Sequence, residues 1–319
     1  MKPAVSAQGF IGNTDYDWFR YLRAKGPVDE VNFWQPSGST QFRAVPPGAP
    51  FFFRLKSPYN AIAGFGFFSR FSLAPAWLAW DSFGDLNGAA DLDEMVARIK
   101  RYRHPHEEAQ GERPDGFIVG CIMIGTPIFF ADDEWVREPA DWQQNIVRGK
   151  RIDLMNGEGQ RIFAECLERS HDSGAPADMV AVALDAARRG EPVLIAPRLG
   201  QGTFRIALVS AYGGACAVTH EHSLPVLEAA HIRPFAEGGP HNLSNGMLLR
   251  ADVHRLYDKG YVTVTGDYDF KVSARLMDDY HNGREYLRFD GTRIAVPQAS
   301  PERPGRELLD WHAQEVFRG

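Results

Sequence analysis

The feature that most restricts how this chain can fold is an ordered set of polar residues in its last third. His231, Asn245 and His254 follow one another at separations of 14 and 9 residues. A neutral imidazole titrates near the pH of a cell, so His231 can act as a general base. The amide of Asn245 can bridge backbone groups and hold that base in register. His254 and Asp258 are four positions apart, so on a helix both would project from one face and could bind one divalent cation.

Four short segments carry this set in order, at residues 216–219, 227–234, 242–249 and 254–258. Together they resemble the HNH, or ββα-metal, nuclease family in the variant that reads EAAHIxP…NGxxL…HxLxD. The resemblance covers about residues 205–276. It implies a β-hairpin followed by a helix. The implied catalytic residues are His231 as the base on the first strand, Asn245 in the loop after it, and His254 as a metal ligand.

The metal site is the part of this motif that departs from the family. Phosphodiester hydrolysis needs a deprotonated water and stabilisation of the charge that develops on the phosphate and the leaving oxygen. Many HNH enzymes place a metal-binding His or Asp directly before the base, where this chain has Ala230. The expected ligands are His254, Asp258 and Glu228, although Glu228 could instead orient another ligand. This set suits Mg²⁺ or Mn²⁺, with Ni²⁺ or Co²⁺ as substitutes in vitro.

The cysteines exclude two other kinds of site. Cys121, Cys166 and Cys216 are far apart and form no CxxC pair. Their odd number and wide spacing argue against a disulfide framework and against a four-cysteine zinc ribbon.

The N-terminal part is rich in aromatic residues, glycine and proline, and its pattern predicts mainly strands. Strands are expected at residues 51–56, 61–70 and 116–125, with Gly64 and Gly66 marking a bulge or a close backbone approach. Helices are expected at residues 15–25, with Asp15 as the N-cap, and at 91–103. Together these elements predict a small, strongly bent β-barrel with peripheral helices.

Residues 46–53 (PPGAPFFF) and 60–67 (NAIAGFGF) resemble the strand pattern of PUA-like domains, a superfamily that includes EVE, ASCH and SRA modules. Some members recognise a modified base that is flipped out of the DNA helix. Such a pocket needs aromatic faces for stacking and polar groups that read the edge of the base. For each aromatic side chain, the alternative is a place in the hydrophobic core. The candidate pocket residues are Asn32, Phe33, Trp34, Gln35, Tyr59, Trp77, Trp80 and Asp81.

The predicted fold class is α+β with three regions. Residues 1–150 form the PUA-like domain, 151–196 a helical connector, and 197–319 the HNH nuclease domain. Residues 139–151 are expected to be the exit from the first domain, and the connector is expected to contain helices at 159–170 and 176–189.

A base reader fused to an HNH nuclease resembles modification-dependent restriction endonucleases, so the expected partner is modified double-stranded DNA. A second domain would supply the discrimination that an HNH site lacks, and would raise the effective concentration of the nuclease at marked DNA. Two alternatives remain open. The N-terminal domain could sense a nucleotide signal or RNA, or the protein could be a non-catalytic DNA-binding protein with a decayed HNH site.

Charge and hydropathy limit the environment in which the protein acts. The net charge of −6 argues against non-specific coating of nucleic acid. A local basic surface would still suffice for binding, and basic residues cluster at 148–151, at 188–189 and at 250–255. The N-terminus lacks the pattern of a secretory signal, and no apolar stretch reaches the roughly 18 residues that span a bilayer. These features predict a cytoplasmic protein without a membrane partner, and a homodimer is the default assembly.

Overall fold

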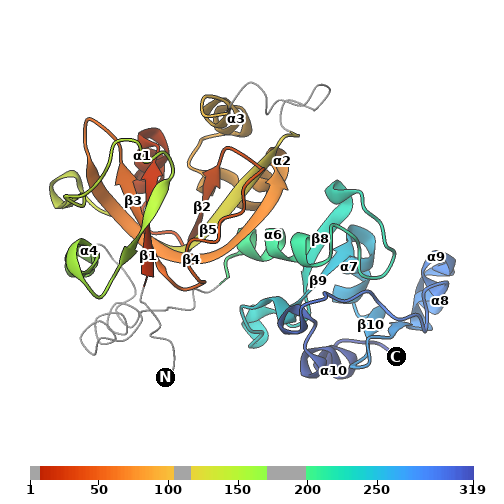
Figure 1. Ribbon diagram of the computed structural model, residues 1–319. Coiled ribbons are helices and arrows are strands. Elements are labelled where there is room, and N and C mark those ends of the chain that lie inside the picture. Colours follow the sequence, from red (N-terminus) through yellow and green to blue (C-terminus); the bar gives the residue numbers. More distant parts are fainter. Residues whose placement is uncertain (1–7, 104–115, 171–198) are drawn as a thin grey trace. The chain divides into compact units, whose positions relative to one another are not determined.

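A computed structural model describes residues 8–103, 116–170 and 199–319 (Figure 1). The chain divides into two compact units, Met1–Thr203 and Phe204–Gly319, and each is considered by itself. The helix expected at residues 176–189 lies outside the described residues, as does the basic pair at 188–189. None of the described helices is long and apolar enough to cross a membrane.

The first unit is built on one mixed sheet. The strand order is β2-β5-β4-β3-β1-β7, with β6 paired to β4, and only the β1–β3 pair is parallel. The strands are β1 (Gln8–Thr14), β2 (Glu30–Gln35), β3 (Pro50–Leu55), β4 (Ala61–Pro75), β5 (Ile118–Phe129), β6 (Val136–Arg137) and β7 (Gly149–Asp153).

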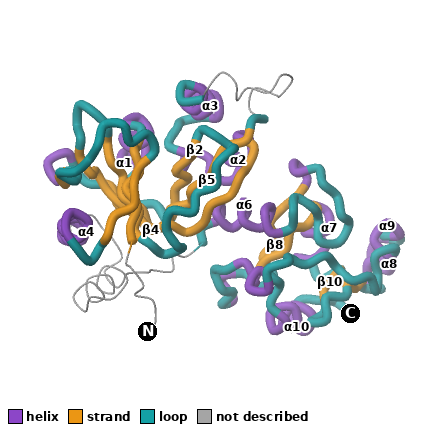
Figure 2. Tube along the Cα trace, viewed as in Figure 1, coloured by secondary structure: helices purple, strands orange, loops and turns teal. Residues whose placement is uncertain are grey.

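The sheet is strongly curved but open (Figures 1 and 2). Its long strand β4 has register shifts between Phe65 and Phe67 and between Phe68 and Arg70, and such bulges bend a strand. A Cβ atom at Gly64 would overlap the carbonyl oxygen of Ile128, so the expected close backbone approach is confirmed. Closing a barrel requires the first and last strands of the path to pair, and no pairing between β2 and β7 occurs among the described residues. The described strands therefore form an open curved sheet rather than the closed barrel that the sequence predicted.

Four described helices accompany this sheet: α1 (Tyr16–Lys25), α2 (Ala76–Phe83), α3 (Leu92–Lys100) and α4 (Gly157–Ser170). The expected N-cap of α1 is confirmed, because Asp15 accepts a hydrogen bond from the backbone N–H of Trp18 at 3.0 Å. Asp91 does the same for α3 through the N–H of Glu94 at 2.8 Å. Three of the four helices were thus expected from sequence at nearly these bounds, and α2 was not.

One apolar core of the first unit lies between the sheet and α4. Phe52, Phe65 and Phe67 from the sheet pack in one cluster with Phe163 and Leu167 of α4. Burial of this apolar face, more than helix propensity, stabilises α4. The region expected to leave the domain therefore returns to it: β7 pairs antiparallel with β1, and α4 then packs on the sheet.

All three cysteines are free and buried. Burial raises the pKa of the Cys121 thiol to about 12 and also raises that of Cys166. The three thiols are therefore not paired with one another in this structure.

The second unit contains two small antiparallel hairpins and several helices. The first hairpin is β8 (Leu227–His231) with β9 (Gly246–Arg250), and α7 (Ala251–Asp258) follows it directly. This is the hairpin-and-helix arrangement expected from the sequence motif. The remaining elements are α6 (Gln201–Ala211), β10 (Val262–Val264), β11 (Phe270–Val272), α8 (Arg275–Tyr280), α9 (Arg284–Leu287) and α10 (Arg306–Glu315).

A buried histidine joins α10 to α7 and β10. His312 is 2% exposed and stacks on the ring of Tyr257, with centroids 3.6 Å apart. Its Nε2 donates to the carbonyl oxygen of Tyr257 at 3.1 Å, so its Nδ1 accepts from the hydroxyl of Thr263 at 2.8 Å. Burial lowers the pKa of His312 to about 4, which keeps the imidazole neutral.

Candidate functional site

The hairpin of the second unit places the predicted residues close together in the fold. His231 is the last residue of β8 and pairs in register with Gly246, the first residue of β9. Asn245 directly precedes Gly246 at the end of a short 3₁₀ turn, Leu243–Asn245. Because α7 begins at Ala251, it carries both His254 and Asp258 back past the hairpin.

The His231 imidazole is partly buried under an aromatic ring. The ring of Phe204, on α6, stacks on it with centroids 4.1 Å apart and planes inclined by 6°. A Cβ atom at Gly246 would overlap the same Phe204 ring, so a larger residue at the start of β9 would displace that ring. Burial, followed by the nearby imidazoles of His241 and His254, lowers the pKa of His231 below its ordinary value. A neutral imidazole at neutral pH can accept a proton.

Asn245 fixes the loop between the two strands from within. Its Oδ1 accepts from the N–H of Arg233 at 2.9 Å, and its Nδ2 donates to the carbonyl oxygens of Arg233 at 2.9 Å and Pro240 at 3.1 Å. The side chain is 1% exposed, so these three bonds replace water at buried groups. Asn245 therefore positions the backbone two residues from His231 and has no free polar group for substrate.

His254 lies between two carboxylates. Its Nδ1 is 2.7 Å from Oε2 of Glu228 on β8, and its Nε2 is 3.5 Å from Oδ2 of Asp258. A carboxylate only accepts, so Nδ1 is the nitrogen that donates to Glu228. Glu228 and Asp258 thus face opposite nitrogens of one ring. For this reason the three side chains do not meet at one point, and within the described ranges no three His, Cys, Asp or Glu side chains form a metal-binding group.

The donor set at Nε2 still fits a divalent cation. One imidazole nitrogen and one carboxylate oxygen, from residues four apart on α7, are chemically suited to Mg²⁺ or Mn²⁺. The Nδ1–Glu228 hydrogen bond matches the arrangement that orients histidine ligands in metal sites. The residues present therefore fit the group with His254 and Asp258 as ligands and Glu228 as an orienting partner.

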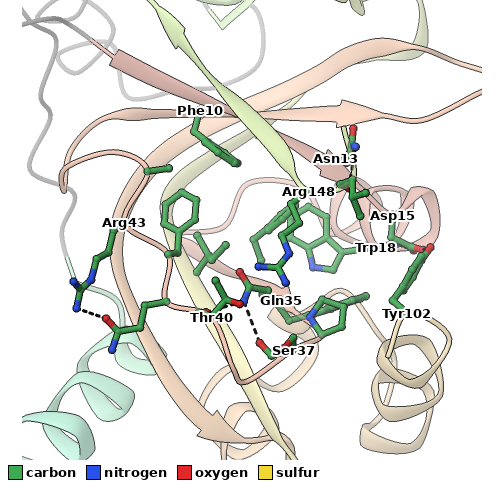
Figure 3. Close-up of a pocket in the computed structure, with 18 of the residues that line it drawn as sticks. Phe10, Asn13, Asp15, Trp18, Gln35, Ser37, Thr40, Arg43, Tyr102 and Arg148 are labelled. Carbon is green, nitrogen blue, oxygen red and sulfur yellow. Dashed lines mark hydrogen bonds between the residues drawn. The ribbon is translucent and has the colours of Figure 1, made fainter. Parts of the chain in front are cut away.

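The first unit contains a cavity of about 420 Å³ (Figure 3). Three of the eight residues predicted for a base pocket line it: Phe33, Trp34 and Gln35. Trp34 donates its Nε1–H to the carbonyl oxygen of Asn87 at 3.2 Å. Gln35 donates its amide to the carbonyl oxygens of Ser37 at 3.0 Å and Thr40 at 2.9 Å, which closes the loop that follows β2.

The other five predicted residues lie away from this lining. Asn32 is fully buried and donates to Oδ1 of Asn87 at 2.8 Å. Tyr59 stacks on the ring of Tyr16 with centroids 4.6 Å apart. The remaining three, Trp77, Trp80 and Asp81, are on α2 and do not line the cavity.

Sequence reasoning missed much of the lining because it comes from separate strands and loops. The additional aromatic residues are Phe10, Trp18, Phe42 and Tyr102, and the additional charged residues are Asp15, Arg43, Lys56 and Arg148. Arg148 belongs to a basic cluster visible in the sequence, which was the one available signal. Phe204 at the nuclease hairpin was also missed, since no local pattern connects it with His231.

The hairpin, its loop and the following helix, with His231, Asn245 and His254 on them, define the class of site found in HNH nucleases. Residues 216–265 match the model of a family described as HNH endonuclease. This segment of the chain is therefore similar to HNH endonucleases, as the sequence motif indicated. A search of curated proteins finds no match for this chain.

Three solved structures resemble the chain at low identity. An ASCH protein from Zymomonas mobilis is 11% identical with a TM-score of 0.28, covering 49% of this chain and 93% of its own. The modification-dependent restriction endonuclease TagI is 14% identical with a TM-score of 0.27, covering 95% and 79%. The type IV phosphorothioation-dependent restriction endonuclease ScoMcrA is 12% identical with a TM-score of 0.20, covering 71% and 45%.

Proposed function

We propose that this protein is a metal-dependent DNA endonuclease of modification-dependent restriction, in which the second unit cuts and the cavity of the first unit reads a modified base. The observation that carries the nuclease part is the partly buried imidazole of His231, stacked on Phe204 with its pKa lowered, within a segment that matches the HNH endonuclease family. A neutral base held on a rigid hairpin is what hydrolysis of a phosphodiester requires.

In the proposed reaction His231 accepts the proton of the attacking water. The flat contact with Phe204 restricts the orientation of the imidazole, and Asn245 fixes the loop that follows it. Phe204 and Asn245 therefore limit the orientations that the His231 imidazole can adopt. Such a restriction accelerates the reaction most when the reacting atoms are already aligned.

His254 and Asp258 would hold the divalent cation, and Glu228 would keep the proton of His254 on Nδ1. When bound, such a cation stabilises negative charge on the phosphate and on the leaving oxygen. The sequence left two roles open for Glu228, as a metal ligand or as an orienting partner. Its hydrogen bond to His254 supports the second role.

The cavity supports the second half of the proposal. Its volume of about 420 Å³ is in the range of small-ligand sites, and Phe33, Trp34 and Phe42 supply aromatic surface. A flipped base needs such surface for stacking and nearby polar atoms for its edge, which Gln35 and Thr40 provide. The five predicted residues outside the lining take no part in this proposal.

The test is a panel of plasmids that differ in one chemical mark. Unmodified DNA and DNA with 5-methylcytosine, 5-hydroxymethylcytosine, glucosylated bases or phosphorothioate linkages are incubated with the protein and Mg²⁺ or Mn²⁺. Cutting confined to one marked substrate is the expected result. Equal cutting of all plasmids, or cutting only after a small molecule or RNA is added, would reject the reading of modified DNA.

His231→Ala is the matched inactive control in this panel. Loss of the base lowers the cleavage rate by roughly 10²- to 10⁴-fold, while DNA binding in a gel-shift assay stays within about twofold of wild type. If no metal supports cutting by the wild-type protein, so that the two proteins behave alike, the chain is a non-catalytic DNA-binding protein.

A further inference from the structure

The cavity of the first unit has an excess of positive charge. Arg43, Lys56 and Arg148 line it, and Asp15 is the one carboxylate among the lining residues. Both oxygens of Asp15 are already used: Oδ1 accepts from the N–H of Trp18 at 3.0 Å, and Oδ2 accepts from the hydroxyl of Tyr102 at 2.6 Å. The lining therefore carries three positive charges against one negative charge, and the carboxylate is held by neutral donors of the protein.

The three cations differ in how they are engaged. Arg43 donates to the side chain of Gln41 at the margin of the cavity (Figure 3). The ammonium of Lys56 lies 5.0 Å from the ring centre of Tyr102. The guanidinium of Arg148 points into the cavity, near Gln35 and Trp18 (Figure 3). In the described part of the chain it has no side-chain partner.

The backbone that carries Arg148 is held by hydrogen bonds from Asn13 of β1. The N–H of Asn13 donates to the carbonyl oxygen of Arg148 at 2.9 Å. The side-chain Nδ2 of Asn13 donates to the carbonyl oxygens of Ile146 at 2.7 Å and Val147 at 3.1 Å. One residue of β1 thus binds three consecutive carbonyl groups directly before β7 begins.

A buried cation holds Asn13 in turn. Arg54 is 6% exposed, and its Nη1 donates to Oδ1 of Asn13 at 2.8 Å. Its Nε donates to Glu138 at 2.7 Å, and its guanidinium lies 4.4 Å from the ring centre of Trp142. Because Arg54 is fully engaged, it orients Asn13 and the segment 146–148 without competing for a ligand. Its network places a second guanidinium, that of Arg148, at the aromatic cavity, and among the described residues this group has no side-chain partner.

We propose that the cavity binds a nucleotide as base plus phosphate, and that Arg148 binds the phosphate oxygens while the aromatic walls take the base. This assignment deepens the proposed function and rests on its statement that the cavity reads DNA. A guanidinium matches phosphate geometry through two parallel N–H donors, and an aromatic wall contacts any base. A neutral base alone would leave the charge of Arg148 without a partner.

The experiment titrates the full-length protein with deoxynucleoside 5′-monophosphates and with the matching nucleosides. The probes are the four ordinary nucleotides, 5-methyl-dCMP and 5-hydroxymethyl-dCMP, measured by calorimetry and by tryptophan fluorescence. At least one monophosphate is expected to bind tenfold or more tightly than its nucleoside, because the phosphate adds a charge-assisted pair. Arg148→Gln should abolish that difference, and Arg148→Lys should keep part of it.

Lys150→Gln is the matched control. It removes the same charge two residues away, from a lysine that pairs with Asp141 at 2.8 Å and does not line the cavity. The control should keep the preference for the monophosphate, and thermal melting should show all variants folded. Equal binding of nucleoside and monophosphate, a preference that survives in Arg148→Gln, or no binding of any nucleotide at millimolar concentration would overturn the assignment.

The two proposals fail separately. Nucleotide binding that depends on Arg148, together with equal cutting of all plasmids, would keep the phosphate site and reject modification-dependent cutting. Selective cutting that is unchanged in Arg148→Gln would keep the restriction function and reject this role of Arg148.

Discussion

The ring of Phe204 lies flat on the imidazole of His231, with centroids 4.1 Å apart and planes 6° from parallel. The contact joins His231, the proposed base at the end of β8, to helix α6, which begins before the HNH motif. It both excludes water from one face of the imidazole and limits its rotation. The contact therefore affects the pKa of His231 as well as its orientation.

Phe204→Leu should change the pH dependence of cleavage. Because burial is the largest cause of the lowered His231 pKa, a smaller, non-planar side chain that admits water should raise that pKa toward its ordinary value. A general base works in its neutral form, so activity is lost as pH falls through the pKa. The acid limb of the rate profile should move to higher pH, with cleavage below pH 6.5 reduced by about threefold to tenfold.

Single-turnover cleavage between pH 5 and pH 8 measures this shift. Phe235→Leu is the matched control, since Phe235 is 60% exposed in the same unit and contacts the ring of His241, with the two planes tilted by 45°. An acid limb that is identical in wild type and Phe204→Leu would show that the stacked ring does not influence the base.

Asn245→Ala should destabilise the second unit and slow cleavage. It leaves the N–H and carbonyl oxygen of Arg233 and the carbonyl oxygen of Pro240 without their partner, at a cost of about 1–3 kcal/mol in the free energy of unfolding. Misplacement of the loop beside His231 should lower the rate by about 10²-fold. Urea unfolding and nicking assays measure the two effects.

Asn242→Ala is the control for this loop, because it removes an exposed amide three residues away whose Oδ1 accepts from the hydroxyl of Ser244. Its stability and rate should stay near wild type. A rate for Asn245→Ala equal to that of Asn242→Ala would remove Asn245 from the positioning role.

Glu228→Ala should weaken metal binding without removing a ligand. Loss of the carboxylate frees the Nδ1 proton of His254, and loss of such an orienting partner typically costs 10- to 100-fold in metal affinity. Glu228→Gln keeps an acceptor for Nδ1 and should recover part of the affinity. His254→Ala should abolish Mn²⁺ binding, and Asp258→Asn should weaken it.

Calorimetric titration with Mn²⁺ separates these outcomes, and the exposed Glu237→Gln controls for loss of one negative charge in the same unit. If Glu228→Gln binds as poorly as His254→Ala, Glu228 is a ligand rather than an orienting residue.

His312→Gln should reduce the acid sensitivity of folding. The pKa of His312 is about 4 in the folded protein against an ordinary value of 6.5, so the neutral form is favoured on folding. Its contribution is fully present above pH 6.5 and is lost as pH falls toward 4, by about 3 kcal/mol in total. Urea unfolding of the wild type and of His312→Gln at pH 7 and pH 4 measures the contribution of His312, because the two proteins share all other titrating groups. Equal losses of stability would contradict this assignment.

The nuclease motif could be predicted from sequence because its parts are close along the chain. The hairpin, the 3₁₀ turn at Asn245 and α7 together occupy residues 227–258, so spacing alone constrains their geometry. The opposite orientation of Glu228 and Asp258 around His254 could not be read from spacing, since it depends on the rotamer of one ring.

The cavity was harder to predict because its walls are assembled by strand pairing. β1 pairs with β7, and the segment before β7 carries Arg148 to a surface that also contains Phe10 and Asn13. A tryptophan-rich helix such as α2 has the composition of a stacking surface, yet Trp77 and Trp80 lie elsewhere. Composition indicates which side chains can stack on a base but not which ones share a concave surface.

The burial of all three cysteines has a practical consequence for following the protein in solution. Thiolates react with maleimides far faster than thiols, and Cys121 and Cys166 are kept in the protonated form within the core. A cysteine introduced at an exposed position such as Val147, which is 80% exposed, would be the fast-reacting site on an otherwise unaltered chain. A fluorophore attached there would lie beside the cavity and report ligand binding, and no native cysteine would have to be removed first.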